Sequence, residues 1–155
     1  MKQDSNYLID MEKTMSIQKN DDLYVSDVLL SLDKFPVIGK TVIFKEALEE
    51  MGRSRLGIAC IVDERNNLLG ILTDGDIRRK LLKVQKPFSA FFVDDALDHA
   101  IQSPITILPT DTLKNAIDVM ERKEVWDLPV VNEEGALLGL LHLHKAIQEL
   151  LEIGT

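Results

Sequence analysis

Apolar side chains recur at helical spacing in the stretch that begins at Thr41. Phe44, Ala47, Leu48 and Met51 stand at positions i, i+3, i+4 and i+7, which places them on one face of a helix. The pattern therefore predicts an amphipathic helix that packs this face against the rest of the protein.

Two apolar runs follow this helix and are typical of strands. Ile58–Val62 is continuously apolar, as expected of a buried strand, and Leu68–Leu72 returns after the polar turn Asp63–Asn67. A second amphipathic stretch, opened by Asp74-Gly75-Asp76, then runs through Leu82. The predicted order is helix, strand, strand, helix.

The same pattern occurs again 69 residues later. Of the 42 positions from Thr41 to Leu82, 13 are identical after this shift without a gap, whereas average composition gives about three by chance. Gly70 coincides with Gly139, and the later strands are predicted at Leu128–Val131 and Ala136–Leu141. The apolar helix face recurs as Leu113, Ala116, Ile117 and Met120. The chain carries an internal duplication.

Shorter elements precede each copy. Val25–Leu32 and Ala96–Ile101 are predicted as short helices, and each is followed by an extended piece, Pro36–Ile38 and Pro104–Ile107 respectively. The polar residues 1–22 are expected to be a flexible leader or linker, residues 23–86 the first repeat and residues 87–155 the second.

A two-stranded unit of this size does not bury its own apolar face well. Two units that stack by their sheets bury these faces against each other. We therefore expect an α+β fold in which the copies form one body with pseudo-two-fold symmetry.

Composition and charge narrow the class of protein. The 155 residues carry a net charge of −8, which argues against a nucleic-acid partner because such partners demand a basic patch. The single cysteine excludes an internal disulfide framework. Apolar runs fall short of the roughly 20 residues of a membrane span, and the polar N-terminus has no signal-peptide core. A cytoplasmic protein without a membrane partner is expected.

Candidate chemistry gathers where the strand after Leu68 meets the following helix. Thr73, Asp74 and Asp76 crowd the helix N-terminus, whose unpaired N–H groups commonly receive phosphates. Both carboxylates would repel a phosphate if they faced it, so one must point away or be compensated by Arg78 or Arg79. The alternative is that Asp74 only caps the helix and both arginines are solvated.

These motifs resemble a known family. The string Thr73–Arg79, together with Leu128–Val131 and His142–His144, is similar to a tandem CBS (Bateman) module, closest to the C-terminal CBS pair of KpsF/KdsD-type arabinose-5-phosphate isomerases. The string also resembles CBS pairs attached to sugar nucleotidyltransferases. The resemblance implies clefts between the repeats, a regulatory role and frequently a homodimer. An isomerase activity would reside on a further N-terminal domain, so the chain is expected to be either an excised regulatory half or a protein that stands alone.

The resemblance also implies which residues bind the ligand. Thr73 and Asp76 would hold the phosphate and the ribose hydroxyls, and Val37 and Thr106 would line the clefts. Backbone groups of the middle strands would hold the base, at Ala59, Cys60, Leu128 and Pro129. The side chain of Cys60 itself is expected to be a small buried apolar group.

The second copy departs from this pattern. His142 stands where Thr73 stands, and Lys145 replaces Asp76, so recognition of a diol is in doubt there because an ammonium accepts no hydrogen bond. Lys145 with His144 would still hold a phosphate or carboxylate. A metal on the two histidines is disfavoured because spacing reveals no third ligand. Trp126 either stacks on a base or packs before its strand.

The sequence thus favours a regulatory module that senses AMP, ATP or a cytidine nucleotide and acts on a sugar-phosphate isomerase or nucleotidyltransferase. The alternative is a structural dimerisation module whose clefts bind nothing. An autonomous enzyme is disfavoured because no nucleophile–base pair is evident.

Overall fold

The structure, a computed structural model, describes residues 23–153; the predicted leader at residues 1–22 and residues 154–155 lie outside the described part. The first repeat contributes β1 (Val37–Gly39), α3 (Phe44–Ser54), β2 (Ile58–Val62), β3 (Leu68–Thr73) and α4 (Asp74–Lys83). The second repeat contributes α6 (Leu113–Lys123), β4 (Asp127–Val131), β5 (Leu137–His142) and α7 (Leu143–Ile153). The other described elements are α2 (Val25–Val28), α5 (Phe88–Phe92) and the 3-10 helix η1 (Ala96–His99).

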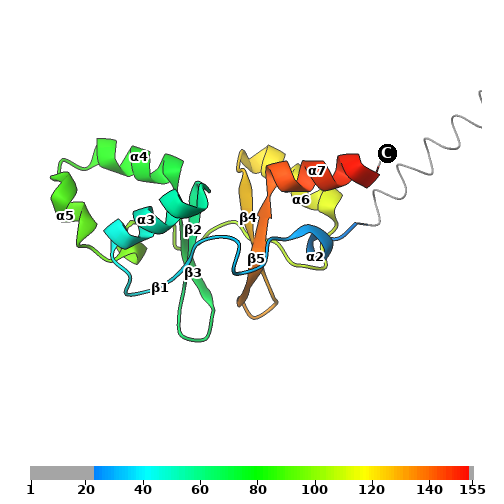
Figure 1. The fold of residues 1–155 in the computed structure, drawn as a ribbon, viewed down its shortest axis with the longest axis horizontal. Helices are drawn as coiled ribbons and strands as arrows, with labels where there is room; N and C mark the ends of the chain where they lie inside the picture. Colours follow the sequence, from blue (N-terminus) through cyan, green and yellow to red (C-terminus); the bar gives the residue numbers. More distant parts are fainter. Residues whose placement is uncertain (1–22, 154–155) are drawn as a thin grey trace, which may run out of the picture.

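Each repeat is built around an antiparallel hairpin, β2–β3 or β4–β5, and the two hairpins face each other at the centre of the molecule (Figure 1). The register shifts between Ile61 and Val62 in the first hairpin, and between Val130 and Val131 in the second. These irregularities stand 69 residues apart, so the duplication extends to the detail of strand pairing.

The two sheets differ at one edge. In the first repeat β1 pairs in parallel with β2, and the Cys60 N–H donates to the Pro36 carbonyl over 2.9 Å. The position that matches Cys60 is Pro129, which has no N–H to donate. The extended piece of the second repeat is accordingly reduced to a single parallel bridge between Ile107 and Val130.

Three apolar clusters hold these layers together. One lies between the two sheets, where alternate side chains of β2 such as Ile58, Cys60 and Val62 meet Leu137 and Leu140 of β5. The opposite face of each hairpin packs against its own helices, with Ala59 and Ile61 among the buried residues of the first repeat. The expected stacking of two α+β units by their sheets is confirmed.

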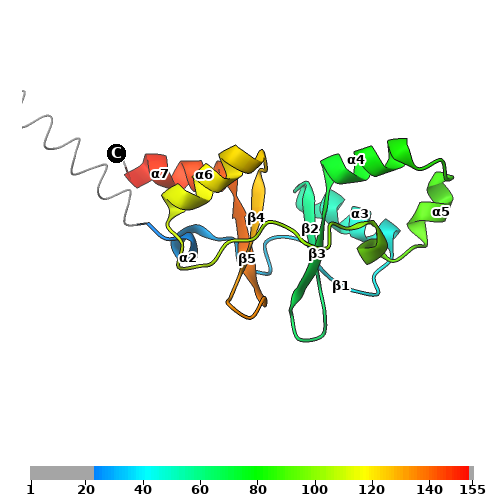
Figure 2. The same cartoon turned by 180° about the vertical axis from the view of Figure 1, so that it is seen from behind.

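The short helices α2 and η1 pack onto the repeat that they do not precede. Val25 and Val28 of α2 lie in the core of the second repeat with Leu113 and Leu128, while Ala96 of η1 lies in the core of the first. Figure 2 shows α2 beside α6 and α7, far from the first repeat that follows it in sequence. The boundaries 23–86 and 87–155 remain a prediction about sequence units, since in space each unit lends its first segment to the other.

Both short helices end earlier than predicted. Helix α2 stops at Val28 because Leu30 exchanges backbone hydrogen bonds of 2.7 and 3.0 Å with Leu140. Likewise η1 stops at His99, and Ile101 exchanges bonds of 3.0 and 2.9 Å with Ile71. The prediction of helices through Leu32 and Ile101 was wrong in extent because strand pairing takes over.

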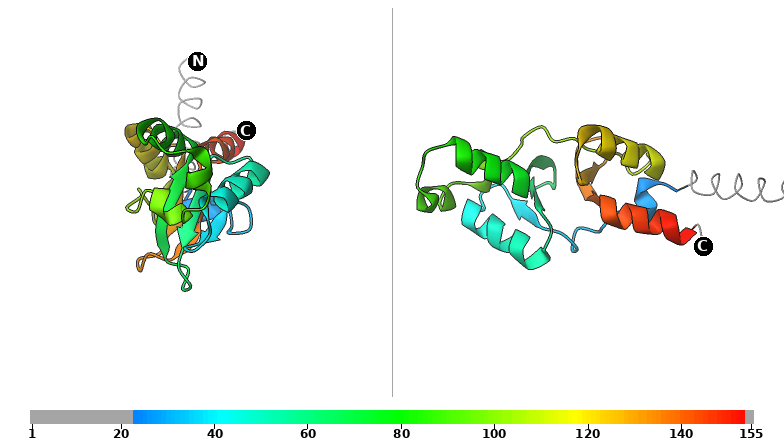
Figure 3. Two further views of the ribbon diagram at one scale, coloured as in Figure 1. Left: turned by 90° about the vertical axis from the view of Figure 1, so that its left-hand side faces the viewer. Right: turned by 90° about the horizontal axis from the view of Figure 1, so that it is seen from above.

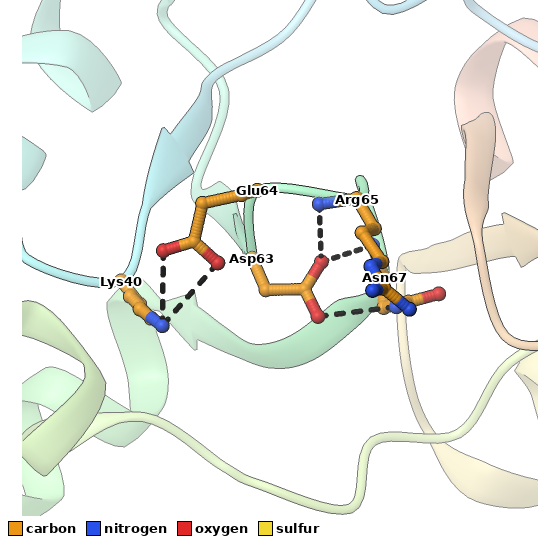
Figure 4. A network of polar contacts seen from close by, with 5 residues as sticks. All are labelled: Lys40, Asp63, Glu64, Arg65 and Asn67. Carbon is orange, nitrogen blue, oxygen red and sulfur yellow. Dashed lines mark hydrogen bonds and ion pairs between the residues drawn. The ribbon is translucent and has the colours of Figure 1, made fainter.

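The hairpin turns are fixed by one side chain in each repeat. Asp63 accepts hydrogen bonds from the backbone N–H groups of Arg65 and Asn67, both at 2.9 Å, beside the Lys40–Glu64 ion pair (Figure 4). These bonds lower the pKa of the Asp63 carboxyl, with Asn67 as the largest cause. Asn132, which is 69 positions later, accepts from its own turn in the same way.

Seen from above, the helices of each repeat form a layer outside its hairpin, so the molecule is elongated (Figure 3). None of the helices between Leu23 and Ile153 has the length and apolar character needed to cross a membrane.

Candidate ligand cleft

A cleft of about 920 Å³ lies where the two repeats meet. Its walls come from the end of β3 and the start of α4 in the first repeat, and from the ends of α6 and β5 and the start of β4 in the second. Residues 103–105 of the connecting segment close it. Ligand sites commonly have volumes of about 300–1,000 Å³, so this cleft has the size of a small-molecule site.

The first wall is organised around the carboxylate of Asp76. Thr73 is the N-cap of α4: its hydroxyl accepts from the Asp76 N–H over 3.2 Å and donates to Asp76 Oδ2 over 2.5 Å. Arg79 Nη2 lies 2.6 Å from Asp76 Oδ1. Of the two arginines considered from the sequence, Arg79 is therefore the one that compensates Asp76, while Arg78 is exposed outside the cleft.

Asp74 also lines the cleft, beside Gly57. A Cβ built on Gly57 would come within 2.7 Å of Asp74 Oδ2, so this carboxylate lies directly over the Gly57 backbone. Both carboxylates therefore line the cleft, and the expectation that one of them points away from a bound phosphate or is compensated stays a prediction. The helix begins at Asp74, as predicted.

The second wall holds a histidine–carboxylate pair. His142 Nδ1 lies 2.7 Å from Asp127 Oδ1, and both side chains are largely buried, with exposed fractions of 25% and 13%. Burial raises the pKa of the Asp127 carboxyl above its ordinary range, and the hydrogen bond to His142 opposes this shift without cancelling it. With Nδ1 occupied, the Nε2 of His142 is the ring atom left for a ligand.

Three residues predicted as ligand contacts thus line one cleft, namely Thr73, Asp76 and His142. The other predicted contacts do not line it. Ala59, Cys60 and Leu128 are fully buried within their strands. Val37 is half-buried on β1, and Thr106 and Lys145 are exposed. Their roles in ligand binding stay predictions.

Cys60 and Lys145 already have local explanations. Burial raises the pKa of the Cys60 thiol to about 12, so the thiol is neutral and packs as an apolar group, as expected. Lys145 Nζ lies 3.3 Å from Glu149 on the same helix. No three His, Cys, Asp or Glu side chains within residues 23–153 gather in a way that would hold a metal ion.

The sequence reasoning missed Asp127 and Lys123 as cleft residues. A signal for Asp127 existed, since the 69-residue shift pairs it with the fully buried Ile58. A carboxylate at a buried strand position needs a polar partner, and His142 is directly opposite it on β5. Lys123 gave no such signal because it is an exposed residue at the end of an amphipathic helix.

The fold and the cleft place this protein in the class built from two α+β repeats with a cleft at their interface. The sequence profile of the CBS domain matches residues 25–83 and again residues 94–152. This chain therefore belongs to the CBS domain family.

Curated relatives extend beyond the matched region. A Helicobacter pylori protein named only as uncharacterised is 37% identical over 127 residues, 81% of this chain and 36% of the relative. The “Probable arabinose 5-phosphate isomerase” of Haemophilus influenzae is 36% identical over 108 residues, 70% of this chain and 31% of that protein. The Escherichia coli arabinose 5-phosphate isomerase KdsD is 28% identical over 126 residues, 81% of this chain and 37% of that protein. The chain thus spans about a third of the length of these relatives.

Solved structures share the fold. CBSX2 in complex with AMP superposes with a TM-score of 0.75 at 22% identity and covers 86% of this chain and 99% of its own. The CBS pair of MJ0100, in complex with 5′-methylthioadenosine and S-adenosylmethionine, gives a TM-score of 0.68 at 20% identity, covering 85% and 98%. At these identities the likeness shows the fold alone.

Proposed function

We propose that this CBS pair binds a nucleotide in the cleft between its repeats and thereby regulates a sugar-phosphate enzyme. The observation that carries the proposal is the wall formed by Thr73, Asp76 and Arg79 at the N-terminus of the ten-residue helix α4. Helix N–H groups and a guanidinium attract phosphate, while a carboxylate accepts hydrogen bonds from the two hydroxyls of a ribose.

The proposed ligand is an adenosyl compound such as AMP or ATP, or a cytidine nucleotide. Two fold relatives were solved with AMP or with adenosine derivatives, which supports the adenosyl class. The relatives named as arabinose 5-phosphate isomerases support an isomerase as the regulated enzyme. In this proposal the CBS pair itself performs no chemistry.

A second candidate is a structural dimerisation module. Leu82 on α4 and Leu151 on α7 occupy matching positions and are both strongly exposed, which favours an apolar contact between two CBS pairs. The replacement of Asp76 by Lys145 in the second copy also favours this candidate. Nucleotide binding separates the two functions.

Thermal unfolding with AMP, ATP, CMP and a CMP-sugar tests the proposal. A bound nucleotide at 100 times its dissociation constant stabilises the fold by about 2.7 kcal/mol and raises the melting temperature. Asp76→Ala is expected to abolish that rise, because it removes the acceptor for the ribose and the partner of Arg79.

Asp118→Ala is the matched control. Asp118 also pairs with an arginine of its own helix, Arg122 at 2.8 Å, but lies outside the cleft, so the nucleotide-induced rise should persist. Unchanged melting with all four compounds would reject the nucleotide-sensing function and leave the dimerisation module. A rise that survives Asp76→Ala would remove Asp76 from the site.

A further inference from the structure

Trp126 is exposed to an extent that its size makes unusual. It is the single tryptophan of the chain, it lines the cleft, and 69% of its surface is accessible. Tryptophan is on average a highly buried residue. Within residues 23–153 the indole takes part in no ring pair, cation–π contact or side-chain hydrogen bond. The indole therefore lines the cleft with most of its surface accessible.

The fold does not require this side chain. Trp126 and Gly57 occupy matching positions of the two repeats, since they are 69 residues apart. Their backbone carbonyls accept matching hydrogen bonds. The Gly57 carbonyl accepts from the Asp74 N–H over 3.1 Å, and the Trp126 carbonyl accepts from the Leu143 N–H over 2.8 Å. One repeat forms this junction with no side chain, and the other carries the largest side chain available.

The walls of the cleft are chemically unequal. The first repeat contributes the polar groups of Thr73, Asp76 and Arg79, and no side chain at Gly57, where a Cβ would meet Asp74. The second repeat contributes the indole, and Lys123 and the His142–Asp127 pair line the same cleft. A ligand that satisfies both walls has an anionic, hydroxyl-bearing end and a flat aromatic end.

We propose that Trp126 is the stacking platform for the base of the bound nucleotide and so determines the ligand class. The inference rests on the proposed function, since it assigns the aromatic half of the same site. The second repeat then selects a nucleoside phosphate over a sugar phosphate. Stacking tolerates any base because every base has a π face, so adenine and cytosine nucleotides both engage the indole.

Tryptophan fluorescence tests this directly, because all tryptophan emission comes from position 126. The full chain is titrated with AMP, CMP and ribose 5-phosphate, with emission and heat of binding followed in parallel. Both nucleotides are expected to quench the emission with the dissociation constant found by calorimetry. Ribose 5-phosphate, which has no base, should bind about 5- to 150-fold more weakly, the range that stacking energies imply, and without quenching.

Substitutions complete the experiment. Trp126→Leu should weaken AMP binding by the same factor in calorimetry, and Trp126→Phe should restore most of the affinity because a ring is retained. Phe88→Leu is the control, since Phe88 is a 65% exposed aromatic side chain outside the cleft and its loss should leave the affinity unchanged.

The results of these experiments separate the stacking role of Trp126 from the nucleotide-sensing function. Nucleotide binding by calorimetry with constant emission, and with unchanged affinity in Trp126→Leu, would overturn the stacking role while the nucleotide-sensing function stands. An absence of both heat and melting shift with every nucleotide would overturn the function itself, and the stacking role with it.

Discussion

Residues with positive φ stand at matching positions of the two repeats. Arg55 and Glu124 end helices α3 and α6 with φ values of 57° and 54°. Asn66 and Gly135 turn the two hairpins at 65° and 90°. Asparagine and glycine are the residues that adopt this conformation at low cost, whereas Arg55 and Glu124 do so as helix C-caps. The duplication is therefore retained in backbone conformation where the side chains have diverged.

Gly70 and Gly139 are retained for a different reason, the close approach of another chain segment. A Cβ at Gly70 would lie 2.8 Å from the Ile101 carbonyl oxygen, and one at Gly139 would lie 2.5 Å from that of Leu30. Both obstacles are backbone atoms that take part in strand pairing, so they cannot move aside cheaply.

Gly70→Ala and Gly139→Ala are each expected to lower the free energy of unfolding by about 1–3 kcal/mol through overpacking. Gly52→Ala is the control: Gly52 lies within α3 with no atom near its Cβ position, so the change should stabilise by about 0.5–1 kcal/mol. Urea unfolding of the three variants measures the effects. Equal stability of Gly70→Ala and the wild type would contradict the close approach of the Ile101 backbone to Gly70.

At the scale of elements, the exchange of α2 and η1 ties the repeats together. Val25, fully buried, reaches the core of the second repeat from the first segment of residues 23–86. The hairpin ends add to this connection, because the Asn66 side chain donates to the Leu137 carbonyl over 2.7 Å. Neither repeat has a complete core without residues from the other, so we expect them to fold together.

Val25→Ala should destabilise the protein by about 2 kcal/mol through lost burial and a residual cavity. Amide hydrogen exchange should accelerate most in α6, β4 and β5, which lie 88 to 117 residues later in the chain. Val93→Ala, at a 70% exposed site, is the control and should change neither stability nor exchange. Acceleration confined to β2 and β3 would contradict the exchanged packing.

At the scale of the whole molecule, two histidine–aspartate pairs act oppositely on stability. Asp127 in the cleft has a raised pKa because burial outweighs its bond to His142. Asp94, at the far end of the first repeat, accepts hydrogen bonds from Lys86 and His99 at 2.7 and 2.9 Å, which lower its pKa. Folding thus disfavours the anionic form of Asp127 and favours the anionic form of Asp94.

The two asparagine variants should therefore show opposite pH profiles. For Asp127, whose pKa is raised in the folded state, the stability of the wild type falls as pH rises from about 3.8 through the raised pKa. The free energy of unfolding of Asp127→Asn should therefore increase relative to that of the wild type over this pH range. For Asp94, whose pKa is lowered in the folded state, the stabilising contribution of the carboxylate is present above about pH 3.8 and is lost as pH falls. The loss of stability caused by Asp94→Asn should therefore become smaller at acidic pH. Denaturant unfolding from acid to neutral pH measures both, and parallel profiles would contradict the assignment.

The sequence alone determined the duplication, the order of helices and strands, the stacking by sheets and the family. These follow from periodicity and from motifs such as Thr73–Asp76, which local patterns encode. It also pointed to His142 as a cleft residue, through its match with Thr73. Strand positions such as Cys60 were correctly expected to be buried, because five consecutive apolar residues have no solvent-facing side.

Only the tertiary structure decided which repeat receives α2 and η1, and which side chains meet in the cleft. Arg79 rather than Arg78 pairs with Asp76, and Asp127 meets His142, because helix rotation and strand register set these contacts. Trp126 and Thr73 lie 53 positions apart in the sequence and share one cleft. A local pattern carries the period of a helix or strand, but contacts between distant segments depend on how the finished layers pack.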